Sequence, residues 1–444
     1  MCDLVVAMPD ATKSGNVIFG KNSDRPAREC QVLHYSAPQV NQKQIECSYI
    51  TLPESDEKLA TFGCRPYWCW GYETGMNEAG VVGGNAAIYT RSLWLPENRK
   101  EPGLTGMDLL RLGLERGATA EHAVNVITQL LEEYGQWGSA VQGKDHENGS
   151  YENSFLIADA NEVWVLETTG KRWIAEKITS GIRSISNEPT IRTNRTKSIE
   201  GIEQFALNNG WWSKSEDDFD FAYVYGDHEH YSRQVSHIRL KRSAQLLEKY
   251  VGEITIRTIM NILRDHYEDT FLDGPQFHQF LPDFLTLCMH DSPAKFTWGN
   301  TATSVVVELS KDREIPPPFW LSYLPPCTSI YLPFFLNGTV PEQVTNTGKI
   351  GMNVYRPEEA PADEFAANSL WWRLNRLLEE ITKDPQKRHN EVRKQFDTLE
   401  KEFISKVQGK DQKLNKEVKS EIMQTTVSKV LQEIESFENN WNLV

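Results

Sequence analysis

The second residue of this chain is a cysteine, and a cysteine in that position can carry out acyl transfer. Methionine is normally removed when the next residue is small, so loss of Met1 would give Cys2 a free α-amine beside its thiol. An α-amine with a pKa of about 7.7 to 8.0 can accept the proton of a thiol with a pKa of about 8.5. One residue would then supply both the nucleophile and the base. The alternative is that Cys2 is a small buried side chain at the end of a strand.

Two predicted strands must position this cysteine. Residues 2–7 and 16–20 are short, largely apolar stretches separated by a turn-rich loop. If they pair as an antiparallel hairpin, the cysteine lies opposite residues 20–22. Lys21 and Asp24, in a polar loop after the second strand, would then lie beside the chain terminus. Asp24 could hold the α-ammonium, and Lys21 would lower the pKa of the thiol; the alternative is a solvated polar turn.

The bulk composition indicates a globular protein. The chain has 444 residues, of which 39% are hydrophobic, and its 13 tryptophans can fill a sizeable core. The formal net charge of -15 argues against nucleic acid or an anionic membrane as a partner. The sequence has no stretch long and apolar enough to span a membrane and no basic, apolar leader, so we expect a cytoplasmic protein.

The seven cysteines point to the same compartment. Their number is odd, and their spacing lacks the paired pattern of a zinc site. We therefore expect reduced thiols, no metal and no organic cofactor. His290, next to Asp291, could suggest a catalytic pair, but packing or a turn is the favoured interpretation.

Hydrophobic periodicity predicts an α+β chain in which hairpins of strands are segregated from helices. Thr119 is a plausible N-cap for the second helix. The predicted helices lie near residues 106–116, 119–134, 237–250, 254–266 and, with breaks, 369–441, and predicted strands include residues 80–89, 154–158, 163–168, 173–178, 182–186 and 303–309.

Several motifs occur together and in a fixed order. They are Cys2-Asp3-Leu4-Val5-Val6-Ala7, Phe19-Gly20-Lys21-Asn22-Ser23-Asp24-Arg25, Arg65-Pro66-Tyr67-Trp68-Cys69-Trp70-Gly71, Gly75-Met76-Asn77-Glu78-Ala79-Gly80, the segment 108–117, the stretches 153–155 and 164–170, and Met289-His290-Asp291-Ser292-Pro293. In these motifs the chain resembles the secernin and dipeptidase group of N-terminal-nucleophile (Ntn) hydrolases, from Cys2 to about Trp372. More distant relatives of that group are the penicillin V acylases and bile salt hydrolases.

The resemblance implies a fold and a division of the chain. The implied fold is a four-layer αββα sandwich, in which two antiparallel sheets are stacked between helical layers. Residues 2–368 would form the catalytic domain, and residues 369–444 a charged helical extension. In that extension Val392, Phe396 and Leu399 recur at helical spacing, and we expect this apolar stripe to dock on the same chain.

The resemblance also implies site residues. Cys2 matches the nucleophile, and Asp24 matches the aspartate that contacts the terminal amine. Asn187 and Asn85 look like the two side-chain amides that stabilise the oxyanion, a role that suits neutral donors at strand ends.

Two basic positions complete the predicted site. Arg239 is the favoured counterpart of a catalytic-site arginine, with Arg233 and Arg242 as alternatives. Lys21 stands where the acylases have arginine, which fits the secernin and dipeptidase branch and weakens any transfer of acylase substrates.

The expected activity is hydrolysis of amide bonds in small, dipeptide-like substrates. Two alternatives remain: a non-catalytic scaffold or regulatory protein that keeps the fold, and a penicillin-V-type acylase acting on other amides. The expected partner is a small peptide or amide, neither nucleic acid nor membrane, and a homo-oligomer is possible.

Overall fold

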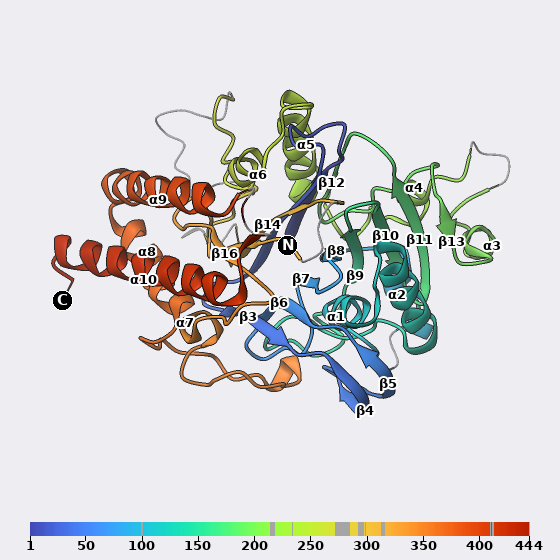
Figure 1. Cartoon of the computed structure of the whole chain (residues 1–444). Helices are drawn as coiled ribbons and strands as arrows, with labels where there is room; N and C mark the ends of the chain where they lie inside the picture. Colours follow the sequence, from blue (N-terminus) through green and yellow to red (C-terminus); the bar gives the residue numbers. More distant parts are fainter. Residues whose placement is uncertain are drawn as a thin grey trace.

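The computed structural model describes residues 1–98, 101–213, 218–232, 234–270, 285–291, 297, 299–311, 316–408, 410 and 413–443. Two large antiparallel sheets occupy the middle of the molecule, and helices cover both of their outer faces (Figure 1).

The first sheet contains the chain terminus. Its six strands run in the order β12-β1-β2-β14-β15-β16, and all neighbours are antiparallel. The strands are β1 (Cys2–Ala7), β2 (Val17–Pro26), β12 (Ile182–Ile185), β14 (Gly299–Leu309), β15 (Phe319–Tyr323) and β16 (Leu332–Phe334).

The hairpin of β1 and β2 forms as expected, but its second strand is longer than the sequence suggested. Cys2 pairs with Ser23, and Leu4 pairs with Lys21, so the polar segment expected to be a loop is strand. The strand continues because β14 pairs along the whole of β2, and the polar side chains on it find buried partners. The strand propensity of the individual residues does not predict this pairing, because it depends on the tertiary structure.

The second sheet has eight strands in the order β13-β11-β10-β9-β8-β7-β6-β3. They are β3 (Gln31–Ser36), β6 (Thr61–Pro66), β7 (Thr74–Asn77), β8 (Val82–Ile88), β9 (Glu152–Ala158), β10 (Val163–Thr169), β11 (Arg172–Ile178) and β13 (Lys197–Ser198). A separate hairpin joins β4 (Gln39–Glu46) to β5 (Thr51–Lys58).

The four layers are established by contacts between elements. Helices α1 (Gly106–Arg116) and α2 (Ala120–Tyr134) pack on the eight-stranded sheet, and α5 (Gln234–Lys249) and α6 (Ile256–Ile262) pack on the six-stranded sheet. Strand β1 faces β8 between the sheets. The expected αββα sandwich is therefore confirmed.

Local sequence explains the helix starts and the close approach of the layers. Thr105 caps α1 in a capping box, and Thr119 caps α2 as predicted. The sheets approach closely at Gly84, where a Cβ atom would lie 2.5 Å from the Lys21 side chain. A larger residue at position 84 would force the Lys21 side chain to shift from its place between the sheets.

Three long helices follow the sheets and lie together at one side of the molecule (Figure 1, orange to red). They are α8 (Leu370–Lys383), α9 (Pro385–Val407) and α10 (Lys416–Asn440), and both α9 and α10 contact β16. The stripe of Val392, Phe396 and Leu399 is buried in the same hydrophobic core as the sheets. Docking on the same chain is thus confirmed, while the proposed domain boundary at residue 369 stays a prediction.

The remaining short helices are α3 (Ile202–Asn208), α4 (Phe221–Tyr225) and α7 (Glu342–Thr345), with 3-10 turns at η1 (Arg91–Trp94), η2 (Pro96–Asn98) and η3 (Pro357–Glu359). Among the helices in the described ranges, none is both long and apolar enough to cross a bilayer.

Candidate active site

A cavity of about 330 Å³ opens where the ends of the two sheets meet. The six-stranded sheet contributes Cys2 and Asp24 to its lining, and the eight-stranded sheet contributes Asn85. The other lining residues are Met1, Arg25, Glu73, Ala87, Tyr89, Val141, Tyr151, Asn187, Tyr231, Ser232 and Ser236. Residues far apart in the sequence therefore converge on the first residues of the chain.

Cys2 lies at the start of β1 and is 5% exposed. Its backbone N–H donates to Asn187 Oδ1 at 3.1 Å, and its Sγ lies 3.9 Å from Glu73 Oε2. Burial raises the pKa of the Cys2 thiol, and the nearby Lys21 ammonium opposes this shift without cancelling it. A base close to the thiol is therefore needed before it can act as a nucleophile.

Met1 lies in the same cavity and is tied to β2. Its nitrogen donates to the backbone carbonyl of Asp24 at 2.9 Å, and the Asp24 N–H donates to the Met1 carbonyl at 2.7 Å. In this form the Cys2 nitrogen is an amide, which cannot accept a proton from the thiol.

Asp24 is fully buried beside the terminus. Its Oδ1 accepts a hydrogen bond from Thr301 Oγ1 at 2.8 Å, and its Oδ2 lies 3.8 Å from an Arg239 nitrogen without accepting a hydrogen bond from any described group. Burial raises the pKa of Asp24 to about 6, although the terminal amine and Arg239 act in the opposite direction. The unused oxygen is a ready acceptor for a further cationic donor.

Arg239 projects from α5 and is fully buried. It forms an ion pair with Asp3 and donates to Asn187 Oδ1 at 2.6 Å. Of the two alternative arginines, Arg242 pairs with Asp265 at 2.5 Å, and Arg233 lies outside the described residues. Neither Arg239 nor Arg242 lines the cavity itself, but Arg239 contacts Asn187, which does. Arg239 is therefore the described candidate that reaches the site.

The two predicted oxyanion donors both reach the cavity. Asn187 uses its Oδ1 to hold Cys2 and Arg239, and its Nδ2 donates to the Ala87 carbonyl at 2.7 Å. The side-chain amide of Asn85 lies 3.0 Å from Asn153 Oδ1. Both amides are within the site, and their action on an oxyanion remains a prediction.

Glu73 was not anticipated from the sequence. It precedes β7 and forms ion pairs across the two sheets, with Lys21 at 3.3 Å and with Arg25 at 3.1 Å. Burial alone would raise its pKa, but Lys21 and Arg25 outweigh burial, so the pKa of Glu73 is lowered and it stays ionised. Arg25 also pairs with Glu29 at 2.5 Å, which extends the network.

A signal for Glu73 does exist in the sequence. This glutamate interrupts an aromatic and glycine-rich stretch that otherwise reads as core, between Gly71 and Gly75. A charge at such a position needs a buried partner. Its partners lie 48 and 52 residues away, on a strand of the other sheet, so the pairing itself could not be inferred.

Parts of this chain are similar in sequence to known proteins. A dipeptidase from Bifidobacterium longum (strain NCC 2705) is 27% identical over 201 residues, covering 40% of this chain and 35% of the dipeptidase. The chain thus spans about a third of the length of that curated relative.

Two solved structures are similar at lower identity. A mutant conjugated bile acid hydrolase from Clostridium perfringens is 13% identical, with a TM-score of 0.42, covering 73% of this chain and 89% of that chain. Penicillin V acylase from Agrobacterium tumefaciens is 14% identical, with a TM-score of 0.41, covering 75% of this chain and 86% of that chain.

The sequence profile of peptidase family C69 matches residues 69–355, which is more than half of the chain. The matched segment includes Glu73, Asn85, Asn187 and Arg239, and the β1–β2 hairpin that carries Cys2 precedes it. Together with the buried constellation around the cavity, this match identifies the chain: it belongs to peptidase family C69.

Proposed function

We propose that this chain is a cysteine-dependent Ntn hydrolase that cleaves the amide bond of dipeptide-like substrates, with Cys2 as the nucleophile after removal of Met1. The observation that carries the proposal is the convergence of Cys2, Asp24, Asn85 and Asn187 on one cavity, with Arg239 held behind them by hydrogen bonds to the Cys2 carbonyl and to Asn187. A scaffold protein would have no need to gather these groups around a thiol.

Removal of Met1 converts the Cys2 nitrogen into an amine in place. That nitrogen already lies 3.1 Å from Asn187 Oδ1, and the free Oδ2 of Asp24 is available for its charged form. The amine takes the proton of the thiol, and the thiolate attacks the substrate carbonyl carbon. The raised pKa of the Cys2 thiol makes this internal base important.

The next steps complete the transfer. Attack places negative charge on the carbonyl oxygen, and the side-chain amides of Asn187 and Asn85 donate to it. The α-ammonium gives its proton to the leaving nitrogen as the C–N bond breaks. Water then attacks the thioester, which releases the acid and restores the thiol. Lys21 and Arg239 keep Glu73 and Asn187 in place rather than touching the reacting atoms.

The charges around the cavity support a small zwitterionic substrate. Glu73 and Asp24 are carboxylates that can face a substrate ammonium, and Arg25 can face a substrate carboxylate. Tyr89 and Tyr151 supply apolar surface for side chains. A penicillin-V-type amide lacks the ammonium and would leave these carboxylates without a substrate partner.

The test begins with intact mass and N-terminal analysis of the purified full chain, which should begin at Cys2. A panel should then compare free dipeptides, the same dipeptides with an acetylated N-terminus, and penicillin V, with Cys2→Ala as the inactive control. We expect the free dipeptides to be hydrolysed fastest. Hydrolysis by a chain that retains Met1 would contradict the mechanism, because an acylated nitrogen cannot act as the base. Faster cleavage of penicillin V would favour the acylase alternative, and a chain that begins at Cys2 but cleaves nothing would favour the scaffold.

A further inference from the structure

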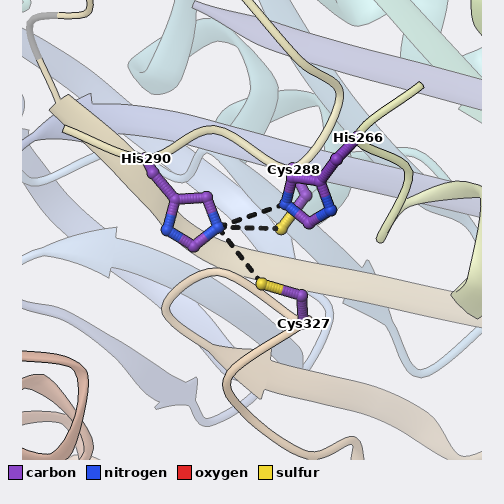
Figure 2. A group of neighbouring side chains, drawn as sticks. All are labelled: His266, Cys288, His290 and Cys327. Carbon is purple, nitrogen blue, oxygen red and sulfur yellow. Dashed lines mark hydrogen bonds between the residues drawn. The ribbon is translucent and has the colours of Figure 1, made fainter. Parts of the chain in front are cut away.

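Four side chains that do not line the cavity meet at one point in the fold (Figure 2). His266, Cys288, His290 and Cys327 are all buried, and their possible ligand atoms lie within 4.8 Å of one another. His266 follows α6, Cys288 and His290 precede β14, and Cys327 follows β15. The cluster therefore joins three separate segments of the chain.

The distances between the four ligand atoms are close to those around a tetrahedral metal ion, and small side-chain shifts would bring them into its range. His290 Nε2 lies 3.2 Å from His266 Nε2, 3.7 Å from Cys288 Sγ and 3.1 Å from Cys327 Sγ. Zinc bonds of about 2.0 to 2.1 Å to nitrogen and about 2.3 Å to sulfur imply ligand atoms roughly 3.3 to 3.8 Å apart. Figure 2 shows the two imidazoles and the two thiols directed towards one another.

Neighbouring groups orient these side chains. Glu268 Oε1 lies 3.3 Å from His266 Nδ1, so the other ring nitrogen, Nε2, faces the cluster. A carboxylate behind a ligating imidazole is the usual outer partner in metal sites. Thr286 Oγ1 donates to the Cys288 carbonyl at 2.6 Å, and Arg393 donates to the Cys327 carbonyl at 3.3 Å.

We propose that these four residues bind a structural Zn²⁺ ion. Two thiolates, two neutral imidazoles and one Zn²⁺ sum to zero charge, which suits a fully buried site. Two sulfur and two nitrogen donors in tetrahedral spacing select zinc over calcium or magnesium, which prefer oxygen ligands. All four positions are filled by protein, so the ion has no place for substrate and its role is structural.

The ion would also support the active site from behind. Met289, between two ligands, donates its N–H to Thr301 Oγ1 at 3.0 Å and accepts from the Thr301 N–H at 3.0 Å. Thr301 in turn donates to Asp24 Oδ1 at 2.8 Å. An ion that holds the segment around Met289 in place would therefore also hold Thr301 in position to donate its hydrogen bond to Asp24.

This proposal departs from the sequence expectation of no metal, and the reason lies in the spacing. His266 and His290 are 24 residues apart, and Cys327 follows His290 by 37 residues. Only Cys288 and His290 are close in the sequence, separated by Met289, so the site has one Cys-x-His pair and lacks the second pair of a zinc motif.

The test is the metal content of the purified full-length protein. We expect about one zinc per chain, and the same content in Cys2→Ala, which removes the thiol that lines the cavity, and in Cys47→Ser, which alters a buried thiol elsewhere. Cys327→Ser should lose most of the zinc and unfold at lower temperature. Chelation should lower the melting temperature of the wild type but not of zinc-free Cys327→Ser.

Cobalt substitution of the wild-type protein keeps the proposal testable if Cys327→Ser does not fold. Bound Co²⁺ should show the strong visible bands of a tetrahedral ion and the ultraviolet charge-transfer bands of thiolate ligands. The proposal is overturned if the wild type binds neither Zn²⁺ nor Co²⁺, or if Cys327→Ser retains a full equivalent of zinc. It is also overturned if Cys288 and Cys327 are found as a disulfide in the metal-free native protein.

Discussion

The thiol of Cys2 and the carboxylate of Glu73 lie 3.9 Å apart, with Lys21 bonded to the same carboxylate. The ionised Glu73 carboxylate raises the pKa of the Cys2 thiol by repelling a second negative charge, and the Lys21 ammonium acts in the opposite direction. The local charge is therefore close to balanced before the thiol loses its proton. Under the proposed mechanism the proton moves only as far as the amine of the same residue, which leaves that balance unchanged.

Replacement of Cys2 by serine should abolish most amide hydrolysis while the fold is retained. A hydroxyl is far harder to deprotonate than a thiol, and the side chains are similar in size. Initial rates on the dipeptide panel and the circular dichroism spectrum test this together. Full activity in Cys2→Ser or Cys2→Ala would refute the assignment of the nucleophile.

Replacement of Asn187 by alanine should reduce turnover by roughly a hundred-fold or more, the usual effect of losing one oxyanion donor. The variant also removes the acceptor for the Cys2 nitrogen and for Arg239. Values of kcat and KM for a cleaved dipeptide are the measurement, with a smaller change expected in KM. An unchanged kcat would mean that Asn187 only supports the strand end.

The raised pKa of Asp24 gives the fold a characteristic pH response. Its ordinary pKa is 3.8, and burial raises it to about 6 in the folded chain. Between these values the folded state holds a proton that the unfolded state has released, so this group's contribution to the free energy of unfolding falls as pH rises from about 4 to about 6. Urea unfolding across this range should show Asp24→Asn gaining stability relative to the wild type as the pH rises. Parallel curves for the two proteins would contradict the shift.

At the scale of elements, α9 is attached to the sheets by a largely buried ion pair as well as by its apolar stripe. Glu400 accepts two hydrogen bonds from Arg264, at 2.6 and 3.1 Å, and a third from the Tyr331 N–H at 3.1 Å. All three links reach elements of the six-stranded half, so α9 is integrated into that half of the sandwich.

Glu400→Ala should destabilise the protein by roughly 3 kcal/mol, because it leaves Arg264, whose side chain is 11% exposed, largely out of water without its counter-charge. Glu402→Ala, on the partly exposed face of the same helix, is a matched control that should cost about 1 kcal/mol or less. Urea unfolding of both variants is the measurement. Equal losses would mean that helix propensity, and not the buried pair, determines the effect.

Much of this arrangement of elements was accessible from the sequence. The N-cap at Thr119 and the buried stripe at Val392 and Phe396 follow from local sequence patterns, and both are present in the structure. The layered fold and the gathering of Cys2 with Asn187 came from motif resemblance, because periodicity does not say which sheets stack. The partners of Glu73 and the cluster around His290 could not be inferred from the sequence, because they depend on contacts between segments that are distant along the chain.

At the scale of the molecule, a net charge of -15 should influence which substrates arrive fastest. The field of a strongly acidic protein attracts cations and repels anions, and salt screens both effects. We expect kcat/KM for a lysine-containing dipeptide to fall as ionic strength rises, and kcat/KM for a glutamate-containing dipeptide to rise. Measuring both at low and high salt tests this. The same response for both substrates would show that local cavity charges outweigh the net charge.

The ion pairs between Lys21, Arg25 and Glu73 connect the two sheets at the edge of the cavity. A buried charge that loses its partner is strongly penalised. The network therefore restricts how this region can change by mutation. Replacement of Lys21 by arginine keeps a positive charge opposite Glu73, so it can occur without a second, compensating substitution. Loss of the positive charge at position 21 would leave Glu73 with Arg25 alone, which Glu73 shares with Glu29. Loss of Glu73 first would leave Lys21 buried without a counter-charge. Positions 21 and 73 are therefore expected to change together or hardly at all.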